Sequence, residues 1–324
     1  MRAKVLGAGV AGLCVAAELV ARGCEVTVFD PAPRPGPHGC SWWAGGMLAP
    51  FCEGETAEEP VVRLGREAVD WWQRQGVRVE RHGTIVLTLG RDRRELDRFA
   101  RRVEGHAALD AAGLAALEPD LGGRFDRALH VAAEAHLDPR VALLHLRDRL
   151  EREGVAFVEG PGPAGGPTFD CRGLAARDSL PDLRGVKGEM AVLRSPDIRL
   201  ARPVRLLHPR FPLYVVPRAD GHFMLGATQI ESDDRRRSVR SVLELLSAAY
   251  ALHPAFGEAE LVEIGVDARP AFPDNLPRLR RRGETIHVNG LFRHGFLLAP
   301  ALARMAVEAA CDHTTPELMD EDHD

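Results

Sequence analysis

The chain has 324 residues, enough for one large domain or two smaller ones. Hydrophobic residues make up 45% of it and charged residues 27%, which is ordinary for a soluble globular protein, and the net charge of −5 excludes the basic excess of a nucleic-acid-binding protein. No run reaches the roughly 18 apolar residues of a membrane span. We therefore expect a cytoplasmic protein with neither membrane nor nucleic acid as a partner.

The six cysteines, at positions 14, 24, 40, 52, 171 and 311, form no CxxC pair and no metal-binding spacing. We expect unpaired thiols in a reducing compartment, and no metal. The basic residues Arg2 and Lys4 before an apolar stretch imitate a signal peptide. Glycines interrupt that stretch and Glu18 ends it, so a nucleotide-binding fold explains it better.

The opening residues predict a strand, a tight turn and a helix. A short apolar run leads into Gly7-x-Gly9-x-x-Gly12, and a helical pattern follows at once. Gly7 permits the turn, Gly9 allows a pyrophosphate to approach the backbone, and Gly12 lets the helix pack on the strand. Asp30 ends the second apolar strand 18 residues after Gly12, near the position of a ribose-binding carboxylate. The alternative is a glycine-rich turn that holds nothing.

The first half of the chain alternates helices and strands. Gly23 ends the first helix, 31–39 is too rich in proline and glycine for a regular element, and Asp138-Pro139 begins a later helix as its cap and first position. Residues 77–89 alternate around His82-Gly83 and predict two paired strands. The expected helices are 10–22, 61–75, 91–102, 111–117 and 140–153, and the strand before the connector 160–167 is 155–158.

The second half is richer in strands and ends in a helix. A hairpin is expected where 213–217 and 222–226 flank Ala219-Asp220-Gly221. The acidic tail 317–324 is expected to be disordered. Further strands are expected at 168–171, 189–193, 261–269 and 286–289, and helices at 239–252 and 297–310. This order predicts an α/β protein without repeats, in which a sheet-based domain interrupts a nucleotide-binding domain.

Four stretches are candidates for a site. Trp42-Trp43 beside small residues suggests backbone close to a flat ligand, or else a loop with aromatic anchors. Tyr214 on the hairpin is either a site residue or a half-buried aromatic. Arg269 leaves an apolar strand either as a surface cap or to bind a carboxylate. The turn 291–300 either stabilises a negatively charged group with the N-terminus of the last helix or only packs on the core. The arginine runs 91–94, 235–237 and 280–282 are interpreted as solvated faces or turns.

Taken in order, these motifs resemble the FAD-dependent D-amino-acid and amine oxidase family, and within it the glycine oxidases of thiamine biosynthesis. The resemblance runs from Lys4 to Ala310. Its most specific parts are the hairpin region His208–Arg218 and the final motif Phe292–Pro300. The other motifs are the opening GAGVAGL, Cys40–Leu48, Asp170–Leu174, Gly185–Glu189, Leu225–Thr228 with Glu231-Ser232, and Ala268–Pro270.

The resemblance implies FAD, not NAD, in a Rossmann-like FAD-binding domain (1–80, 138–185 and 284–324). A mixed antiparallel-sheet domain (81–137 and 186–283) would bind the substrate. Arg269 and the Tyr214 hydroxyl would bind the substrate carboxylate, with Arg293 near both substrate and flavin. The implied cofactor-binding residues are Gly7, Gly9, Val10, Ala11, Gly12, Asp30, Cys40, Ser41, Gly45, Gly46, Met47, Arg293, His294, Gly295, Phe296 and Leu297.

The chain departs from the family pattern in three places. Cys40 and Trp42-Trp43 stand where small or hydroxyl residues are usual. Pro212 replaces a histidine that often precedes the tyrosine by two positions. The region 158–168 is short and loses a strand meander beside the adenine, which is expected to affect FAD affinity more than chemistry.

The implied reaction is oxidation of glycine, or another small amino acid, to the imine, with dioxygen reduced to hydrogen peroxide and the product used for the thiazole of thiamine. The rival of the same family is a sarcosine or D-amino-acid oxidase or dehydrogenase. Rivals of other classes are a flavin-binding protein without turnover and an NAD-dependent dehydrogenase. The sequence leaves the oligomeric state, including a homo-oligomer, open.

Overall fold

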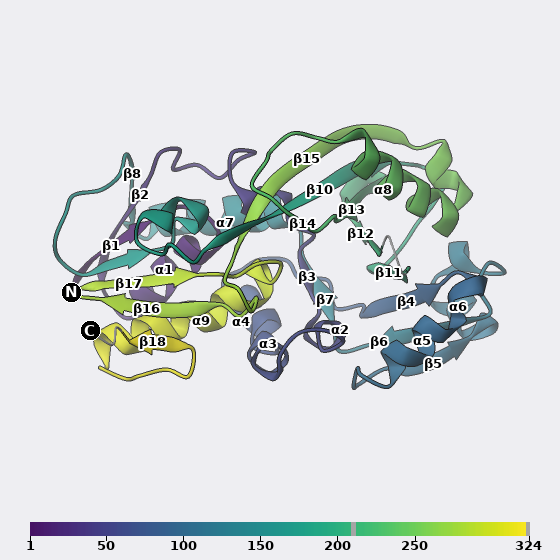
Figure 1. The fold of residues 1–324 in the computed structure, drawn as a ribbon, viewed down its shortest axis with the longest axis horizontal. Coiled ribbons are helices and arrows are strands. Elements are labelled where there is room, and N and C mark those ends of the chain that lie inside the picture. The colour runs from purple at the N-terminus through teal and green to yellow at the C-terminus, as the bar shows by residue number, and fades with distance from the viewer. Residues whose placement is uncertain (209–211, 322–324) are drawn as a thin grey trace.

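In the computed structural model, which describes residues 1–208 and 212–321 apart from the side chains of Arg91 and Glu321, two large sheets lie side by side along the longest axis (Figure 1). The first has seven strands in the order β18-β16-β17-β9-β1-β2-β8. Strands β1, β2, β8, β9 and β17 are mutually parallel neighbours, as in a Rossmann-like unit. These strands are β1 Arg2–Leu6, β2 Glu25–Asp30, β8 Ala156–Glu159, β9 Thr168–Asp170, β16 Arg278–Arg282, β17 Thr285–Asn289 and β18 Met319–Glu321.

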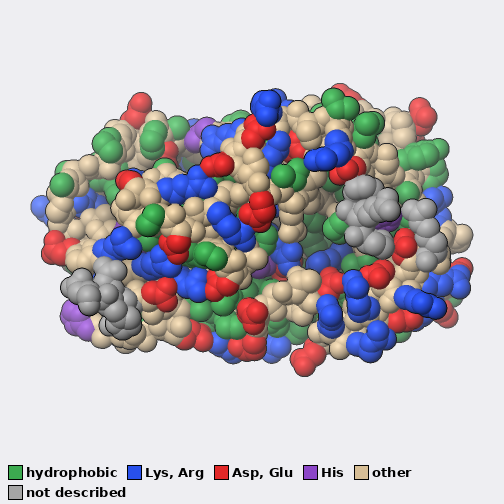
Figure 2. All heavy atoms as spheres, in the orientation of Figure 1, with side chains coloured by type: hydrophobic (Ala, Val, Ile, Leu, Met, Phe, Trp, Pro, Cys, Tyr) green, Lys and Arg blue, Asp and Glu red, His purple; other side chains and the backbone are tan. Residues whose placement is uncertain are grey.

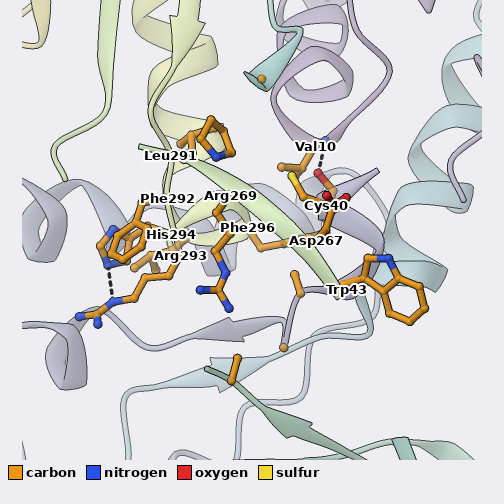
Figure 3. A pocket seen from close by; sticks show the side chains of 18 of the residues that line it. Val10, Cys40, Trp43, Asp267, Arg269, Leu291, Phe292, Arg293, His294 and Phe296 are labelled. Atoms are coloured by element: carbon orange, nitrogen blue, oxygen red, sulfur yellow. Dashed lines mark hydrogen bonds between the residues drawn. The ribbon is translucent and has the colours of Figure 1, made fainter. Parts of the chain in front are cut away.

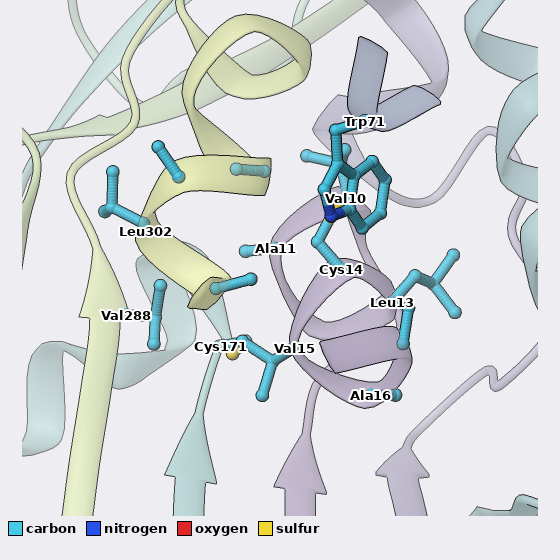
Figure 4. Close-up of a cluster of buried hydrophobic side chains, with 14 of the residues drawn as sticks. Val10, Ala11, Leu13, Cys14, Val15, Ala16, Trp71, Cys171, Val288 and Leu302 are labelled. Atoms are coloured by element: carbon cyan, nitrogen blue, oxygen red, sulfur yellow. The ribbon is translucent and has the colours of Figure 1, made fainter. Parts of the chain in front are cut away.

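Helices bury the apolar side of this sheet. The first helix, α1, packs between α7 and α9, and α4 packs on α9. Figure 4 shows the centre of this core, where Ala11 and Val15 of α1 face Val288 and Leu302 and Leu13 lies on the opposite side of α1. The N-cap of α7 is Asp138, whose carboxylate accepts hydrogen bonds from the amides of Arg140 and Val141. The helices are α1 Val10–Ala21, α3 Glu59–Gly65, α4 Ala68–Arg74, α7 Pro139–Arg152 and α9 Gly295–Cys311.

The second sheet has nine strands in the order β14-β10-β13-β12-β11-β4-β6-β5, with β15 paired to β10. It is mostly antiparallel, and a separate hydrophobic core lies under α8. The strands are β4 Thr84–Thr88, β5 Ala107–Asp110, β6 Arg127–Val131, β10 Arg184–Arg194, β11 Val204–Leu207, β12 Leu213–Pro217, β13 His222–Gly226, β14 Ile230–Glu231 and β15 Glu260–Ala271. The helices beside it are α5 Arg93–Ala100, α6 Ala111–Leu117 and α8 Val239–Leu252.

Short elements connect the two sheets. Strand β3 (Met47–Leu48) pairs with β7 (Ala135–His136), and α2 (Pro50–Glu53) follows β3 directly. The predicted α/β fold is confirmed. The predicted domain ranges stay a prediction, and β16 pairs in the seven-stranded sheet although its residues precede the expected boundary at 284. No helix of the described residues is long and apolar enough to cross a membrane.

Several predicted elements are wrong in detail. The single helix 61–75 is two helices, because Gly65 lies against Leu297 and the chain makes tight turns at Arg66 and Glu67. The strand pair in 77–89 does not form. Only β4 does, and its partners β6 and β11 are distant in the sequence.

The tail 317–324 is not disordered over its described part. Strand β18 pairs with β16, and Glu317 forms an ion pair with Arg63. The last three residues of that predicted segment, 322–324, lie outside the described residues.

Candidate active site

A cavity of about 750 Å³ is lined by residues from both sheets. Figure 3 shows side chains from the α1 end, from the turn before α9 and from β15 around the same space. In Figure 2 the surface is hollowed near the middle of the face, and charged side chains surround the hollow. The cavity is therefore built by segments that are far apart in the sequence.

One end of the cavity is the glycine turn between β1 and α1. Gly7 has φ +99°, and a Cβ there would lie 2.6 Å from the carbonyl oxygen of Cys171. A Cβ on Gly12 would collide with the carbonyl oxygen of Gly7. A Cβ on Gly9 would meet only the Ser41 hydroxyl, at 3.3 Å. Gly7 and Gly12 are thus required by the fold itself, while Gly9 lies at the cavity.

Asp30, at the end of β2, holds this turn in place. Its carboxylate accepts hydrogen bonds from the amide of Ala8 at 2.8 Å and from the amide of Ala32 at 2.7 Å. It also lines the cavity. An ionised carboxylate has about four acceptor positions, so two remain for a ligand hydroxyl.

Two helix N-termini meet beside the turn. The amide of Val10 in the first turn of α1 donates to the Ser41 hydroxyl at 3.1 Å. A Cβ on Gly295, the first residue of α9, would lie 3.3 Å from a methyl group of Val10. Helix N-termini carry partial positive charge, so this corner suits an anionic ligand.

The loop 40–47 forms the next part of the wall. A Cβ on Gly45 would lie 2.8 Å from the Tyr214 ring, so the backbone passes directly over that ring. Arg218, after β12, fixes the loop by donating to the carbonyl oxygens of Gly45 at 2.6 Å and Leu137 at 2.5 Å. Burial lowers the pKa of Arg218 to about 10.

The tryptophans of this loop are anchors on the nine-stranded sheet. The indole N–H of Trp43 donates to the carbonyl oxygen of Pro37 at 3.0 Å, and its ring fills the space above Gly265 of β15. Arg140 lies over the rings of Trp42 and Trp43 and forms an ion pair with Glu263 at 2.7 Å. Trp43 lines the cavity as well. The interpretation as an aromatic anchor is therefore confirmed, and the proximity of this loop to a flat ligand stays a prediction.

Tyr214 on β12 and Arg269 on β15 both line the cavity from the second sheet. The Tyr214 ring is wedged between Gly45 and Gly226. The Arg269 guanidinium lies flat against Gly188 of β10 and donates to the carbonyl oxygen of Thr228 at 3.3 Å. Burial raises the pKa of Tyr214 and lowers that of Arg269. Among the described residues, no carboxylate lies within ion-pair distance of Arg269.

Arg293 has a different environment. Its Nη2 atom lies 2.7 Å from Glu53 of α2 and donates to the Thr56 hydroxyl, also at 2.7 Å. His294 contacts the same Glu53 oxygen at 2.9 Å. Burial alone would raise the pKa of Glu53, but Arg293, His294 and Arg205 together hold it well below its usual range. In Figure 3 the Arg293 guanidinium points away from that of Arg269.

All the predicted site residues except Gly12 line the cavity. Gly12 lies beneath the turn, where its role is steric. Sequence reasoning missed eight charged residues of the wall, which are Glu53, Glu55, Glu95, Arg98, Arg172, Arg205, Arg235 and Asp267. Asp267 could have been found, because in a strand it shares a face with Arg269 two positions later. The described residues contain no cluster of ligands that could hold a metal ion.

Comparisons with known proteins agree with this geometry. Residues 3–309 match the family model described as FAD dependent oxidoreductase. A Rhizobium etli protein that carries the provisional name thiamine biosynthesis oxidoreductase ThiO is 55% identical over 309 residues, 94% of each chain. Glycine oxidase of Pseudomonas putida is 28% identical over 93% of this chain and 92% of its own. The crystal structure of glycine oxidase from Geobacillus kaustophilus superposes with a TM-score of 0.81 at 22% identity, covering 98% of this chain and 96% of that one, and shows the shared fold.

Proposed function

The chain belongs to the family of FAD dependent oxidoreductases, and from that premise we propose that it oxidises glycine to the imine while dioxygen is reduced to hydrogen peroxide. The similarity to a thiamine biosynthesis oxidoreductase and to glycine oxidases supports this substrate and a role in making the thiazole of thiamine. The electrons balance in this reaction, because the α-carbon and the nitrogen of glycine each lose one hydrogen and dioxygen gains both.

FAD is the cofactor of the family, and the residues present fit it. Gly9 leaves room for a phosphate at the α1 N-terminus, where Val10 and Ser41 lie. Asp30 keeps acceptor positions for ribose hydroxyls. We propose that Cys40, Gly45, Gly46 and Met47 hold the flavin from one side and that residues 293–297 hold it from the other. Bound between these residues, FAD would supply the two-electron redox chemistry of the reaction.

The observation that carries the proposal is Arg269, a half-buried guanidinium at the cavity with no carboxylate beside it among the described residues. A cation that is partly removed from water and has no counter-ion is unfavourable, and a substrate carboxylate would pair with it in the bidentate geometry that arginine favours. The Tyr214 hydroxyl is available to share that carboxylate. The other two arginines at this end, Arg205 and Arg293, already face Glu53.

The reaction requires no side-chain base if the amine binds in its neutral form. Glu53 is a poor base at neutral pH, because the cations around it hold its pKa well below the usual range. Its role is to keep Arg293 and His294 in place at the N-terminus of α9. The substrate carboxylate, fixed by Arg269, then orients the Cα–H bond.

The test is a peroxide assay of the purified, FAD-supplemented protein with glycine, sarcosine and D-alanine. We expect glycine to give the highest kcat/KM. A preference for sarcosine or D-alanine would replace the proposed substrate by that of the family rival. No peroxide with any of the three, from protein that binds FAD, would favour flavin binding without turnover.

The assignment of Arg269 predicts the effect of Arg269→Ala. Truncation leaves the substrate carboxylate unpaired in a dry site, so KM for glycine should rise by about 100-fold, while FAD stays bound. Arg269→Lys should recover part of the loss. Arg194→Ala, which removes a side chain 58% exposed on β10, is the matched control and should leave KM unchanged. An unchanged KM in Arg269→Ala would remove the assigned role.

A further inference from the structure

Three consecutive arginines, Arg235–Arg237, lie between β14 and α8 and have three different environments. The Arg236 side chain is 90% exposed and pairs with Asp234 at 3.0 Å. Arg237 donates to the carbonyl oxygen of Ile264 at 2.7 Å. Arg235 alone of the three lines the cavity, with its Nε atom 2.9 Å from an oxygen of Asp267. The run is therefore not a uniform solvated face.

The Arg235–Asp267 pair is asymmetric in burial. The Asp267 side chain, on β15, is 5% exposed, whereas that of Arg235 is 63% exposed. Besides Arg235, the Asp267 carboxylate accepts a hydrogen bond from the amide of Ala268 at 2.8 Å. The carboxylate is thus a fixed anchor in the wall, and the guanidinium it holds still has donors free for another acceptor.

Asp267 lies beside the start of the loop 40–47, next to the first turn of α1 (Figure 3). In Figure 3 Asp267 reaches toward Cys40, beside the first turn of α1 where Val10 donates its amide. Burial raises the pKa of Asp267, and Arg235 and His38 oppose this rise. Burial and the Asp267 carboxylate raise the pKa of Cys40, and Arg269 and Arg235 oppose that rise. Arg172, another cation of the wall, is already paired with Asp170 at 2.7 Å and Asp178 at 3.0 Å.

A diphosphate brings two negative charges into this corner. A helix N-terminus supplies only about half a positive charge. Two helix N-termini and a neutral hydroxyl therefore neutralise only part of the two negative charges of the diphosphate. An arginine held within reach by a buried carboxylate supplies one, in the planar geometry that suits phosphate oxygens.

We infer that the Arg235 guanidinium binds the diphosphate of FAD, closing over it from the side of the nine-stranded sheet, with Asp267 as its positioning residue. The inference rests on the FAD site of the proposed function. It adds a phosphate contact from the segment before α8 to those of the glycine turn.

The test compares Arg235→Ala with Arg236→Ala, a neighbouring arginine that does not line the cavity. Each apoprotein is titrated with FAD at low and high salt, following the flavin fluorescence, and with riboflavin, which has the same ring but no phosphate. Loss of one charge-assisted contact should raise the Kd for FAD by about tenfold in Arg235→Ala and weaken its salt dependence. Arg236→Ala should bind FAD as the wild type does, Arg235→Lys should be intermediate, and the Kd for riboflavin should not change.

Equal FAD affinities in the two alanine variants would overturn the inference and leave the proposed function intact. An equal loss of FAD and riboflavin affinity in Arg235→Ala would also overturn it, because the arginine would then act on the ring or on the shape of the cavity. A wild-type protein that binds no FAD would overturn the proposed function as well. Far-UV circular dichroism of the apoproteins checks that the exposed substitutions leave the fold unchanged.

Discussion

Arginines of the same cavity have different roles because their partners differ. Arg269 lacks a carboxylate among the described residues, while Arg293 and Arg205 share Glu53. Position in the sequence was enough to single out Arg269, which ends an apolar run on an expected strand. The pairing of Arg293 was not predictable, because Glu53 lies 240 residues away and nothing in its own segment indicates a partly buried ion pair.

Glu53→Gln should reveal this ion pair through the pH dependence of stability. The folded-state pKa of Glu53 lies well below its ordinary 4.5, so the pair contributes stability above that value and loses it as the pH falls below. At pH 7 the variant should be less stable by about 3 kcal/mol, because Arg293 and Arg205 lose a buried counter-charge. Urea unfolding at pH 7, 5 and 3.5 measures the difference, which should persist at pH 5 and shrink at pH 3.5.

The matched control is Glu59→Gln, which breaks an ion pair with Arg63 through a side chain that is 69% exposed. Exposed pairs of this kind contribute about 0.5 kcal/mol or less, so this variant should follow the wild type at each pH. A difference between Glu53→Gln and wild type that is the same at all three pH values would contradict the ionic explanation.

Elements built from local pattern were predicted well, and elements that depend on distant partners were not. The β12–β13 hairpin has the predicted bounds, and its turn places Asp220 at φ +56° as a turn signature requires. Helix α8 also begins and ends where its apolar periodicity does. In contrast, β4 lies between β6 and β11, and β18 adds to β16 at the sheet edge. No local pattern contains that information.

The β1–turn–α1 unit gives a prediction at this scale that separates folding from binding. Gly12→Ala places a Cβ on the Gly7 carbonyl oxygen and should destabilise the apoprotein by about 3 kcal/mol or more, since the backbone must shift. Gly9→Ala meets only a hydroxyl at 3.3 Å and should leave the apoprotein nearly as stable as the wild type. It should, however, weaken FAD binding, because the methyl group points to where a phosphate would approach.

Urea unfolding of the apoproteins and FAD titration measure the two effects separately. Similar stability losses in both variants would contradict the assignment of Gly12 to folding and Gly9 to FAD binding. Unchanged FAD affinity in Gly9→Ala would show that the phosphates lie elsewhere.

At the scale of the whole molecule, the cavity exists because the chain passes repeatedly between the two sheets. The sequence order predicted an interrupted nucleotide-binding domain, and the resemblance predicted which segments meet. It did not predict the charged residues that join them. Arg218 follows a strand of the second sheet yet donates to Gly45 and Leu137. Arg205 of β11 likewise reaches Glu53 and Glu55. Such contacts join segments that meet only in the folded chain, and the hydrophobic periodicity of each segment does not predict them.

If FAD lies across the glycine turn of one sheet and against β15 of the other, its binding should stabilise the chain as one unit. At FAD concentrations 100-fold above Kd, binding contributes about 2.7 kcal/mol. Unfolding entropies near 2 cal/mol/K per residue convert this to a rise in Tm of about 4 °C for a chain of this length. Scanning calorimetry of the apoprotein with and without FAD should therefore show a single transition that moves as a whole, and a smaller shift in Gly9→Ala at the same FAD concentration. Two transitions, of which FAD shifts only the one that belongs to the seven-stranded sheet, would mean that the cofactor does not bridge the sheets. That result would also contradict the placement of Arg269 beside the flavin.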